Sequence, residues 1–554
     1  MLLSVKVTEK SFGSNQLYSN IEIEIQEGEK VGLVGRNGTG KSTLFNIMCG
    51  VDQDFQGEVR EKSGITIISS RQEHHEHDHK TVLEYIQGDL PEYQELIGII
   101  DSYPETMGSN PRKIQKFSDT LERFNELGYY QLEDDLRQSF DVYQIDPATM
   151  HRTLSSLSGG QKRMIELIKV QRSRGDLSLI DEPTNHMDYV SKAAFVKWMT
   201  DFQEAVLVIT HDRDVLDKVD RIIEIRDGKS YAFRGNYSAY LKTNTSQVTS
   251  EVSNYDQTQR RIDNLEQDVI RFRRLKEKSR NPSTIKRFKS QELKARAELA
   301  KLQSIDKPSF WIDQESASNM THKLAGKYEE YKATNIKVRT KKPPTKSDSS
   351  IILRVDNLSL GYKDTPLFDN VNFMLRAGEK LRLHGRNGAG KTTLIKSIAA
   401  TRSGTAIPSQ VFSGEIEITK DLGIGIYEQE IDSSYLGLTL SGALERILLS
   451  KNQIASQQSI KQLMGDYLFN PATDGDMIVS NLSGGQKARL QIISMLAGGP
   501  SLLILDEPTN HLDLPSIEEL ENALRSYSGS IMYISHDSFF ASKLGGETLI
   551  IDKH

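Results

Sequence analysis

The sequence predicts an α/β protein with two tandem domains of alternating strands and helices, joined by a long α-helical hairpin. A glycine-rich loop between an apolar run and a helix-like stretch occurs twice, at 35–42 and at 385–392. The same further motifs follow each loop in the same order. Between the copies, segment 271–301 combines helical spacing of apolar residues with a strong positive charge. A chain of 554 residues is also too long for one hydrophobic core.

The later half of each copy is a strict internal duplication. The Ser-Gly-Gly-Gln runs begin at Ser158 and Ser483, 325 residues apart, and the Asp-Glu pairs that follow them have the same separation. The glutamines after the glycine-rich loops, Gln72 and Gln429, lie 357 residues apart. The first copy therefore carries 32 extra residues within 73–156.

These offsets predict three parts of the chain: a first domain at 1–240, a linker at 241–349 and a second domain at 350–554. The linker has no counterpart in either copy, and its end, 341–350, is polar and contains proline, as is typical of a flexible joint.

The composition excludes several classes of protein. No apolar run approaches the roughly 18 residues of a membrane-spanning helix, and the N-terminus lacks the pattern of an export signal. We therefore expect no membrane span and a cytoplasmic location. The single cysteine, Cys49, excludes an internal disulfide and a cluster held by several thiolates.

The glycine-rich loops predict phosphate binding. Backbone N–H groups of such a loop and the N-terminus of the following helix together hold a triphosphate. Lys41 and Lys391 are expected to contact its β- and γ-phosphates, and the Ser42 and Thr392 hydroxyls to bind Mg²⁺. The predicted ATP-binding residues of the loops are Gly35, Arg36, Asn37, Gly38, Thr39, Gly40, Lys41, Ser42 and Thr43, and Gly385, Arg386, Asn387, Gly388, Ala389, Gly390, Lys391, Thr392 and Thr393.

The remaining motifs predict hydrolysis. Asp181 and Asp506 each end an apolar run, where a carboxylate can bind Mg²⁺, and the glutamate after each is the candidate to polarise the attacking water. A glutamine and a histidine complete each set by contacting Mg²⁺, the water or the γ-phosphate. The predicted catalytic residues are Glu182, Glu507, His211, His536, Gln72 and Gln429, and the predicted metal ligands are Ser42, Gln72, Asp181, Thr392, Gln429 and Asp506.

The linker predicts two antiparallel helices that meet near Pro282, because proline and the residue before it disfavour helix continuation. One apolar stripe is interrupted by Glu292. The stripe residues are Ile262, Leu265, Val269 and Phe272 on the first helix, and Ile285, Phe288, Ala295, Leu299 and Leu302 on the second.

The net charge of the chain is only −6, but segment 271–301 holds twelve Lys or Arg residues and three Glu residues. Such a run is either a solvated spacer or a contact for a polyanion, and the excess of one sign favours folded RNA. The predicted RNA contacts flank the turn: Arg280, Lys286, Arg287 and Lys289.

Each copy resembles the ATP-binding cassette ATPases, which have a P-loop NTPase fold. The resemblance rests on the glycine-rich loop, the Ser-Gly-Gly-Gln run, the Asp-Glu-Pro-Thr-Asn-His segment and the histidine that follows, His211 or His536. Two cassettes on one chain with a charged helical linker resemble the ABC-F group. The resemblance implies a monomer with paired cassettes, a helical insertion within 73–156, and adenine stacking on Phe12 and Tyr362. It also implies that each ATP contacts the opposite copy through Ser158, Gly159, Gly160 and Gln161, or Ser483, Gly484, Gly485 and Gln486.

The resemblance further implies that the linker enters the ribosome near the P-site tRNA, either in a translation factor or in a ribosomal protection protein that confers antibiotic resistance. Two alternatives stay open. One is an ATPase subunit that energises a separate membrane transporter, which the long hairpin between fused cassettes disfavours. The other is a DNA-associated ATPase, which the lack of a basic tail after the second copy disfavours.

Overall fold

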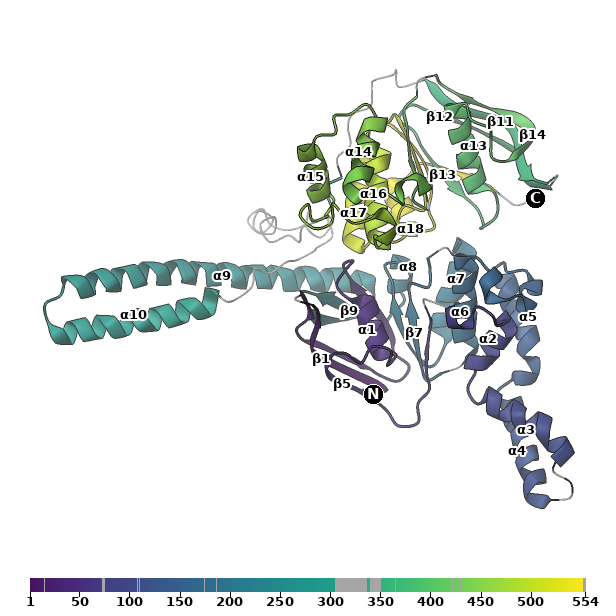
Figure 1. The fold of residues 1–554 in the computed structure, drawn as a ribbon, viewed down its shortest axis with the longest axis horizontal. Coiled ribbons are helices and arrows are strands. Elements are labelled where there is room, and N and C mark those ends of the chain that lie inside the picture. The colour runs from purple at the N-terminus through teal and green to yellow at the C-terminus, as the bar shows by residue number, and fades with distance from the viewer. Residues whose placement is uncertain are drawn as a thin grey trace. The chain divides into compact units, whose positions relative to one another are not determined.

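The structure is a computed structural model (Figure 1). It describes residues 1–13, 15–71, 75–106, 108, 110–173, 175–185, 187–303, 336–338, 350–363, 365–420, 422–428 and 430–551. The chain forms two compact units: Met1–Tyr237 with Ile336–His554, which holds both cassettes, and Ser238–Asn335.

The first cassette is built on a six-stranded sheet. The strands follow the order β10-β9-β4-β8-β7-β6, and all neighbours pair in parallel except β9 and β10. Every residue of β7 and β8 is buried, as expected for central strands covered on both faces. The bounds are β4 (Lys30–Gly35), β6 (Ile67–Ser69), β7 (Leu177–Asp181), β8 (Ala205–Ile209), β9 (Arg221–Arg226) and β10 (Lys229–Arg234).

A second, antiparallel sheet, which was not predicted from the sequence, completes the first cassette. Its order is β2-β1-β3, with β5 also paired to β1. In β3 the isoleucines are buried and the glutamates exposed, the alternation of a strand with one face on the core. The bounds are β1 (Leu3–Phe12), β2 (Asn15–Tyr18), β3 (Ile21–Ile25) and β5 (Gln56–Glu61).

The second cassette repeats both sheets. The parallel sheet has the order β15-β16-β17-β13-β18, and the antiparallel sheet the order β12-β11-β14. One apolar core joins the two sheets to the helix after the glycine-rich loop. The bounds are β11 (Ile351–Tyr362), β12 (Thr365–Arg376), β13 (Lys380–His384), β14 (Gln410–Ile418), β15 (Ile424–Tyr427), β16 (Leu502–Asp506), β17 (Ser530–Ile534) and β18 (Glu547–Ile550).

The helices of the two cassettes correspond, with one exception. In the first they are α1 (Lys41–Met48), α2 (Val82–Asp89), α3 (Tyr93–Thr106), α4 (Pro111–Glu126), α5 (Leu132–Val142), α6 (Gly159–Ser173), α7 (Tyr189–Asp201) and α8 (Arg213–Leu216). In the second they are α13 (Lys391–Ser403), α14 (Leu440–Ser450), α15 (Gln457–Asp466), α16 (Gly484–Leu496), α17 (Leu514–Ser526) and α18 (Ser538–Leu544). Nothing in the described part of the second cassette matches α3 and α4, which pack against each other and account for the extra residues of the first copy.

Short 3₁₀ helices also occur in both cassettes. They are η1 (His75–His77), η2 (Tyr129–Gln131), η3 (Pro147–His151), η4 (Leu154–Ser156), η5 (Ser433–Tyr435) and η6 (Val479–Asn481). None of the helices in the described ranges has both the length and the apolar character needed to cross a membrane.

The second unit contains the predicted helical hairpin, which is confirmed. Its helices are α9 (Tyr237–Lys278) and α10 (Pro282–Gln303), and the turn lies at the predicted place (Figure 1). The Asn281 side chain accepts a hydrogen bond from the Ser283 N–H at 3.0 Å and so caps α10, whose first residue is Pro282.

The predicted stripe lies between the hairpin helices. Ile262, Leu265 and Ala295 are buried, and the Phe272 and Phe288 rings stack with centroids 6.5 Å apart. The glutamate that interrupts the stripe, Glu292, is buried as well. Its carboxylate lies 2.6 Å from Lys276 Nζ and 2.8 Å from an Arg296 nitrogen, so two cations compensate its burial.

Candidate active site

Each glycine-rich loop turns directly into a helix N-terminus. Gly40 and Gly390 cap α1 and α13 with φ of 92° and 91°, a left-handed conformation that glycine adopts without strain. A Cβ at Gly40 would lie 2.5 Å from the Tyr18 hydroxyl, and one at Gly390 would lie 2.7 Å from Cδ1 of Phe368. Both the dihedral angle and the space therefore require glycine at this position.

The lysine of each loop is held over the loop itself. Lys41 Nζ donates to the carbonyls of Gly35 and Arg36, at 2.7 and 3.2 Å. Lys391 Nζ donates to the two equivalent carbonyls, both at 2.8 Å. Burial lowers the pKa of both ammonium groups, and nearby carboxylates, first Glu182 for Lys41, oppose that effect. The ammonium groups thus lie where a triphosphate cradled by the loop would meet them.

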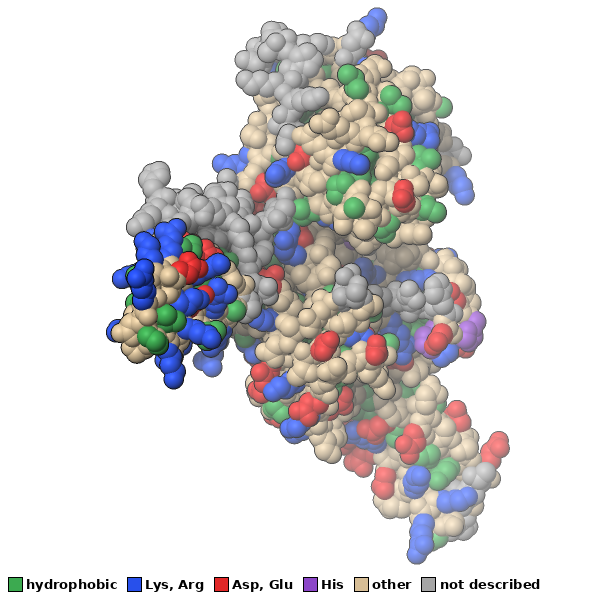
Figure 2. Space-filling model, turned by 60° about the vertical axis from the view of Figure 1, so that its left-hand side comes forward, with side chains coloured by type: hydrophobic (Ala, Val, Ile, Leu, Met, Phe, Trp, Pro, Cys, Tyr) green, Lys and Arg blue, Asp and Glu red, His purple; other side chains and the backbone are tan. Residues whose placement is uncertain are grey.

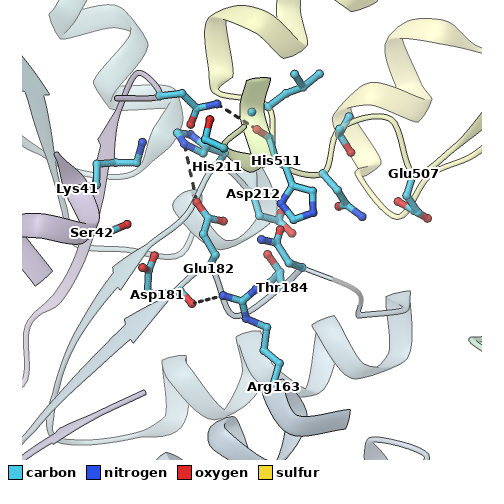
Figure 3. Close-up of a pocket in the computed structure, with 18 of the residues that line it drawn as sticks. Lys41, Ser42, Arg163, Asp181, Glu182, Thr184, His211, Asp212, Glu507 and His511 are labelled. Atoms are coloured by element: carbon cyan, nitrogen blue, oxygen red, sulfur yellow. Dashed lines mark hydrogen bonds and ion pairs between the residues drawn. The ribbon is translucent and has the colours of Figure 1, made fainter. Parts of the chain in front are cut away.

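The predicted magnesium ligands come together in the second cassette. The Thr392 hydroxyl donates to Asp506 Oδ2 at 2.7 Å. Asp506 Oδ1 is buried and has no hydrogen-bond partner among the described residues. A hydroxyl beside a buried, unsatisfied carboxylate oxygen fits a hard divalent cation. In the first cassette, Ser42 and Asp181 line one cavity and lie near each other in Figure 3.

The two candidate general bases have strained backbones. Glu182 and Glu507 have φ of 47° and 51°, in the left-handed region that non-glycine residues rarely adopt. The N–H of each donates to the end of the neighbouring strand, from Glu182 to the Ile209 carbonyl at 2.8 Å and from Glu507 to the Ile534 carbonyl at 3.0 Å. Such strain persists where the surrounding structure fixes the residue, and it clusters at functional sites.

A histidine lies beside each glutamate. His211 Nε2 is 3.8 Å from Glu182 Oε1 (Figure 3), and His536 Nε2 is 3.5 Å from Glu507 Oε1. Burial, and then the charge of Asp181, raise the pKa of Glu182 to about 8, and burial raises that of Glu507 to about 7. Burial, and then the nearby loop lysine, lower the pKa of each histidine to about 3. Each histidine is therefore a neutral imidazole that can donate one N–H.

Residues of both cassettes line one cavity of about 1180 Å³. Lys41, Ser42 and Glu182 of the first copy and Glu507 of the second are among its lining residues (Figure 3). Ser483 of the second copy also lines it. Such a cavity has room for ligands that touch both copies.

Two aspartates join the cassettes at this cavity. Asn37 N–H donates to Asp513 Oδ2 at 2.8 Å, and Asn387 N–H donates to Asp188 Oδ2 at 3.0 Å. The Asn37 side chain also donates to the His511 carbonyl at 3.1 Å. Each glycine-rich loop is thus bound to the Asp-Glu-Pro-Thr-Asn-His-x-Asp segment of the other copy. Sequence reasoning gave these aspartates no role, although both end that repeated segment.

The Ser-Gly-Gly-Gln runs begin α6 and α16. The Ser483 hydroxyl accepts from Gln486 N–H at 3.3 Å, and Ser158 does the same for Gln161 at 3.2 Å. A Cβ at Gly485 would lie 2.4 Å from Asn37 Nδ2, so this run lies directly against the loop of the first copy. The other predicted residues that line the cavity include Asn37, Gly38, Gly40, Thr43, Gly159, His211, Asn387, Gly388, Thr392, Gly484, Gly485 and His536.

The remaining predicted residues lie as follows. Phe12 and Tyr362 end β1 and β11 with exposed fractions of 58% and 46%, and Phe12 lines the cavity. Gln72 and Gln429 lie outside the described residues. Away from the cavity, the four predicted RNA contacts lie at the turn and in the first two turns of α10, and their side chains are exposed: Arg280, Lys286, Arg287 and Lys289.

Comparison with known proteins places this geometry in a family. Segments 18–185 and 368–510, more than half of the chain, match a family model described as ABC transporter, and 223–318 matches a second model of that description. The chain is 31% identical over 560 residues to the ATP-binding protein YdiF of Bacillus subtilis (strain 168), covering 99% of this chain and 80% of that protein. The chain belongs to the ABC-F family of ATP-binding cassette proteins.

Other relatives of this ABC-F protein agree. It is 29% identical over 549 residues to the energy-dependent translational throttle protein EttA of Escherichia coli (strain K12), covering 96% of this chain and 89% of that protein. A solved structure of an RNase-L Inhibitor matches it in fold with a TM-score of 0.55 at 16% identity, covering 99% of this chain and 87% of that chain. As an ABC-F protein, the chain binds and hydrolyses ATP.

Proposed function

We propose that this protein is a ribosome-associated ATPase that acts in translation in the cytoplasm, with the α9–α10 hairpin as its contact to structured RNA. The observation that carries the proposal is the unpaired positive charge at the hairpin turn. Arg280, Lys286, Arg287 and Lys289 have no carboxylate within 4.0 Å in the described part of the chain.

The charge of the hairpin supports a phosphate-rich partner. Its three acidic residues in 271–301 are already used in ion pairs within the hairpin, at Glu277, Glu292 and Glu298. Lys and Arg side chains gather at the end of α9 and α10 in Figure 2. Exposed cations that repel one another are neutralised most effectively by nucleic-acid phosphates. Phosphate contacts position a protein without reading sequence, which suits a folded RNA surface.

The relatives support a role in translation. EttA, which aligns with nearly the whole chain, is named a translational throttle protein. Family resemblance further suggests that the hairpin reaches the region of the P-site tRNA. Of the two roles expected within this family, the names of the relatives favour a translation factor over a protein that confers antibiotic resistance.

At each ATP site, the proposed chemistry follows from the positions of the side chains. The loop lysine and the helix N-terminus bind the phosphates, and the opposite cassette contributes Ser158 or Ser483. In its ionised form, the glutamate accepts a proton from the attacking water as the water approaches the γ-phosphorus, and the neutral histidine donates a hydrogen bond to a γ-phosphate oxygen. Mg²⁺, held by Ser42 and Asp181 or by Thr392 and Asp506, would neutralise charge on the β- and γ-phosphates.

Sedimentation with ribosomes tests the proposal. The double variant Glu182→Gln and Glu507→Gln should bind ATP without hydrolysing it and should pellet with ribosomes in ATP more than the wild type does. The same variant in ADP is the control. A variant that stays in the supernatant in ATP at low salt would overturn the ribosome assignment. Preferential binding to duplex DNA, or co-purification with a membrane protein, would instead favour one of the alternatives.

A further inference from the structure

The side chain of Lys192, in the first turn of α7, contacts the loops that hold His211 and His536. These loops, which follow β8 and β17, are called the first and second histidine loops. The Lys192 ammonium lies 2.6 Å from Asp214 Oδ2 and 3.2 Å from Asp212 Oδ2, both just after His211 of the same cassette. It also donates to the backbone carbonyl of His536, in the other cassette, at 2.6 Å. Lys192 is 7% exposed, so few water molecules can replace these contacts.

The Lys192 ammonium keeps its positive charge. Burial alone would lower the pKa of Lys192, but the carboxylates of Asp212 and Asp214 outweigh it and raise the pKa above its ordinary value. The hydrogen bond to the His536 carbonyl therefore comes from a charged donor, and such bonds are roughly twice as strong as those between neutral groups.

The contact continues to the candidate general base of the second site. The His536 N–H donates to Glu507 Oε2 at 3.2 Å, and the His536 ring faces the other oxygen of the same carboxylate. A chain of polar contacts thus connects Asp214, Lys192, the His536 backbone and Glu507. A shift of the His536 backbone would therefore disturb both the histidine and the glutamate that are proposed to act at the γ-phosphate of this site.

The neighbours of His536 are held by the first cassette as well. The Arg213 guanidinium lies 3.2 Å from Asp537 Oδ2, and it also pairs with Glu521. The Ser538 hydroxyl donates to Asp214 Oδ1. Each of the three consecutive residues His536, Asp537 and Ser538 therefore contacts a side chain of the first cassette.

The other site cannot receive the same support. The internal repeat places Ile517 where Lys192 lies, and Ser538 and Phe539 where Arg213 and Asp214 lie. An isoleucine side chain has no donor for the carbonyl of His211. The counterpart of the contact between Ser538 and Asp214 differs too, because there Arg213 lies over the Phe539 ring, 5.5 Å from its centroid. The two halves of the interface are thus chemically different.

A second residue of α7 adds to the difference. Tyr189, one helical turn before Lys192, packs on His384 with ring centroids 4.5 Å apart. His384 ends the strand that leads into the second glycine-rich loop. The residue equivalent to Tyr189 is Leu514. One face of α7 therefore contacts both the phosphate loop strand and the histidine loop of the second site.

We propose that Lys192 is a positioning residue for the ATP site that contains Glu507 and His536, and that the two ATP sites are unequal because, among the described residues, only this site has a cation of the opposite cassette on its histidine carbonyl. When the cassettes separate, Lys192 leaves the His536 carbonyl and the second site loses its aligned histidine. Hydrolysis at the second site is thereby coupled to cassette closure more tightly than hydrolysis at the first. The inference rests on the assignment of Glu182 and Glu507 as the catalytic bases.

Steady-state ATPase kinetics in single-site backgrounds test the inference. Glu182→Gln leaves only the second site active, and Glu507→Gln leaves only the first. In the Glu182→Gln background, where only the second site is active, Lys192→Met should lower kcat about tenfold or more, because small misplacements of catalytic groups have effects of this size or greater. The KM for ATP should change much less. In the Glu507→Gln background, kcat should fall much less, because on that side Lys192 pairs with Asp212 and Asp214 rather than with the backbone of the catalytic histidine.

Two further variants separate positioning from a merely structural role. Lys192→Arg keeps the charge and should recover most of the lost kcat. Ile517→Met, the matched change at the equivalent position, should not reproduce the selective loss at the second site. Thermal unfolding of each variant in ATP shows whether it is folded. Equal losses in both backgrounds, or no loss in either, would overturn the inference.

A different result would contradict the assignment of Glu182 and Glu507 as catalytic bases: each single Glu→Gln variant would keep the full wild-type rate. In that case Lys41→Ala and Lys391→Ala, which each disable one phosphate loop, provide the two backgrounds. A loss of kcat on Lys192→Met that is confined to Lys41→Ala would still support the inference, and equal losses would still overturn it.

Discussion

Asp188 accepts two hydrogen bonds that serve different parts of the molecule. Its Oδ1 accepts from the Ser191 N–H at 2.8 Å and caps α7, and its Oδ2 accepts from the Asn387 N–H at 3.0 Å in the opposite cassette. Asp513 has the same pair of contacts, to Ser516 and Asn37. Each carboxylate therefore connects the start of a helix to the opposite phosphate loop.

We expect Asp188→Asn to weaken cassette pairing while keeping the helix cap, because asparagine caps helices as well as aspartate does. The new amide group would face the Asn387 N–H, donor against donor. Leaving such a buried donor unpaired costs about 1–3 kcal/mol, so the KM for ATP should rise by about tenfold. Asp201→Asn, at the exposed far end of α7, is the matched control. An unchanged KM for ATP in Asp188→Asn would contradict this expectation.

Alanine should have opposite effects at two glycines. Gly390→Ala places a Cβ 2.7 Å from Phe368 in a left-handed turn, so we expect ATP affinity to fall by about tenfold or more. Gly98 lies inside α3 with open space around it, and Gly98→Ala should stabilise the protein by about 0.5–1 kcal/mol without changing ATP binding. Binding of a fluorescent ATP analogue and thermal unfolding measure both effects. Equal ATP affinities would show that the loop tolerates a side chain.

The hairpin charges should govern the salt dependence of ribosome binding. Changing Arg280, Lys286, Arg287 and Lys289 to Gln should weaken binding and reduce the slope of log K against log salt by about one unit per lost phosphate contact. Basal ATPase should be unaffected. A control with the same change in net charge converts four exposed lysines of the cassettes to Gln: Lys218, Lys229, Lys420 and Lys461. If both variants changed the slope equally, the hairpin would not be the RNA contact.

Glu292 should hold the two hairpin helices together. Glu292→Gln removes the partner of Lys276 and Arg296, whereas Glu277→Gln removes only an exposed pair with Arg273. We expect several-fold faster amide exchange across α9 and α10 in the first variant and little change in the second. Similar exchange in both variants would mean that the apolar stripe alone determines docking.

The same carboxylate predicts a pH dependence. The hydrogen bond from Lys276 lowers the pKa of Glu292 from 4.5. A carboxylate with a lowered pKa in the folded state contributes stability that is present above its unfolded pKa and lost as pH falls below it. Protection of the hairpin amides should therefore decrease as pH falls below 4.5, and Glu292→Gln should remove this dependence.

The sequence predicted the parts of the fold whose signals are local. The spacing of Ile262, Leu265, Phe272 and Phe288 predicted the hairpin stripe, and the proline predicted the turn, because helix periodicity and helix ends are properties of short segments. The antiparallel sheets were missed, although the alternation in 21–25 is a period-two signal that could have predicted β3.

The contacts between cassettes could not be predicted in this way. Asp188 and Asn387 are 199 residues apart, and Lys192 and His536 are 344 apart, so their proximity depends on how two complete domains pair. The repeat does contain one relevant signal: Lys192 and Ile517 occupy equivalent positions and differ in charge. A difference between otherwise matching copies indicates where two similar sites diverge.

The length of α9 has a mechanical consequence. The helix runs without interruption for 42 residues, from Tyr237 to Lys278, which corresponds to about 60 Å at the usual rise per residue. A tilt of one degree at its first turn would displace its far end by about 1 Å. An unbroken helix of this length converts a small change of angle at its base into a larger displacement of its far end. Sub-ångström shifts of the backbone near Tyr237 would therefore move the cationic end of α9 by a distance comparable to a bond length.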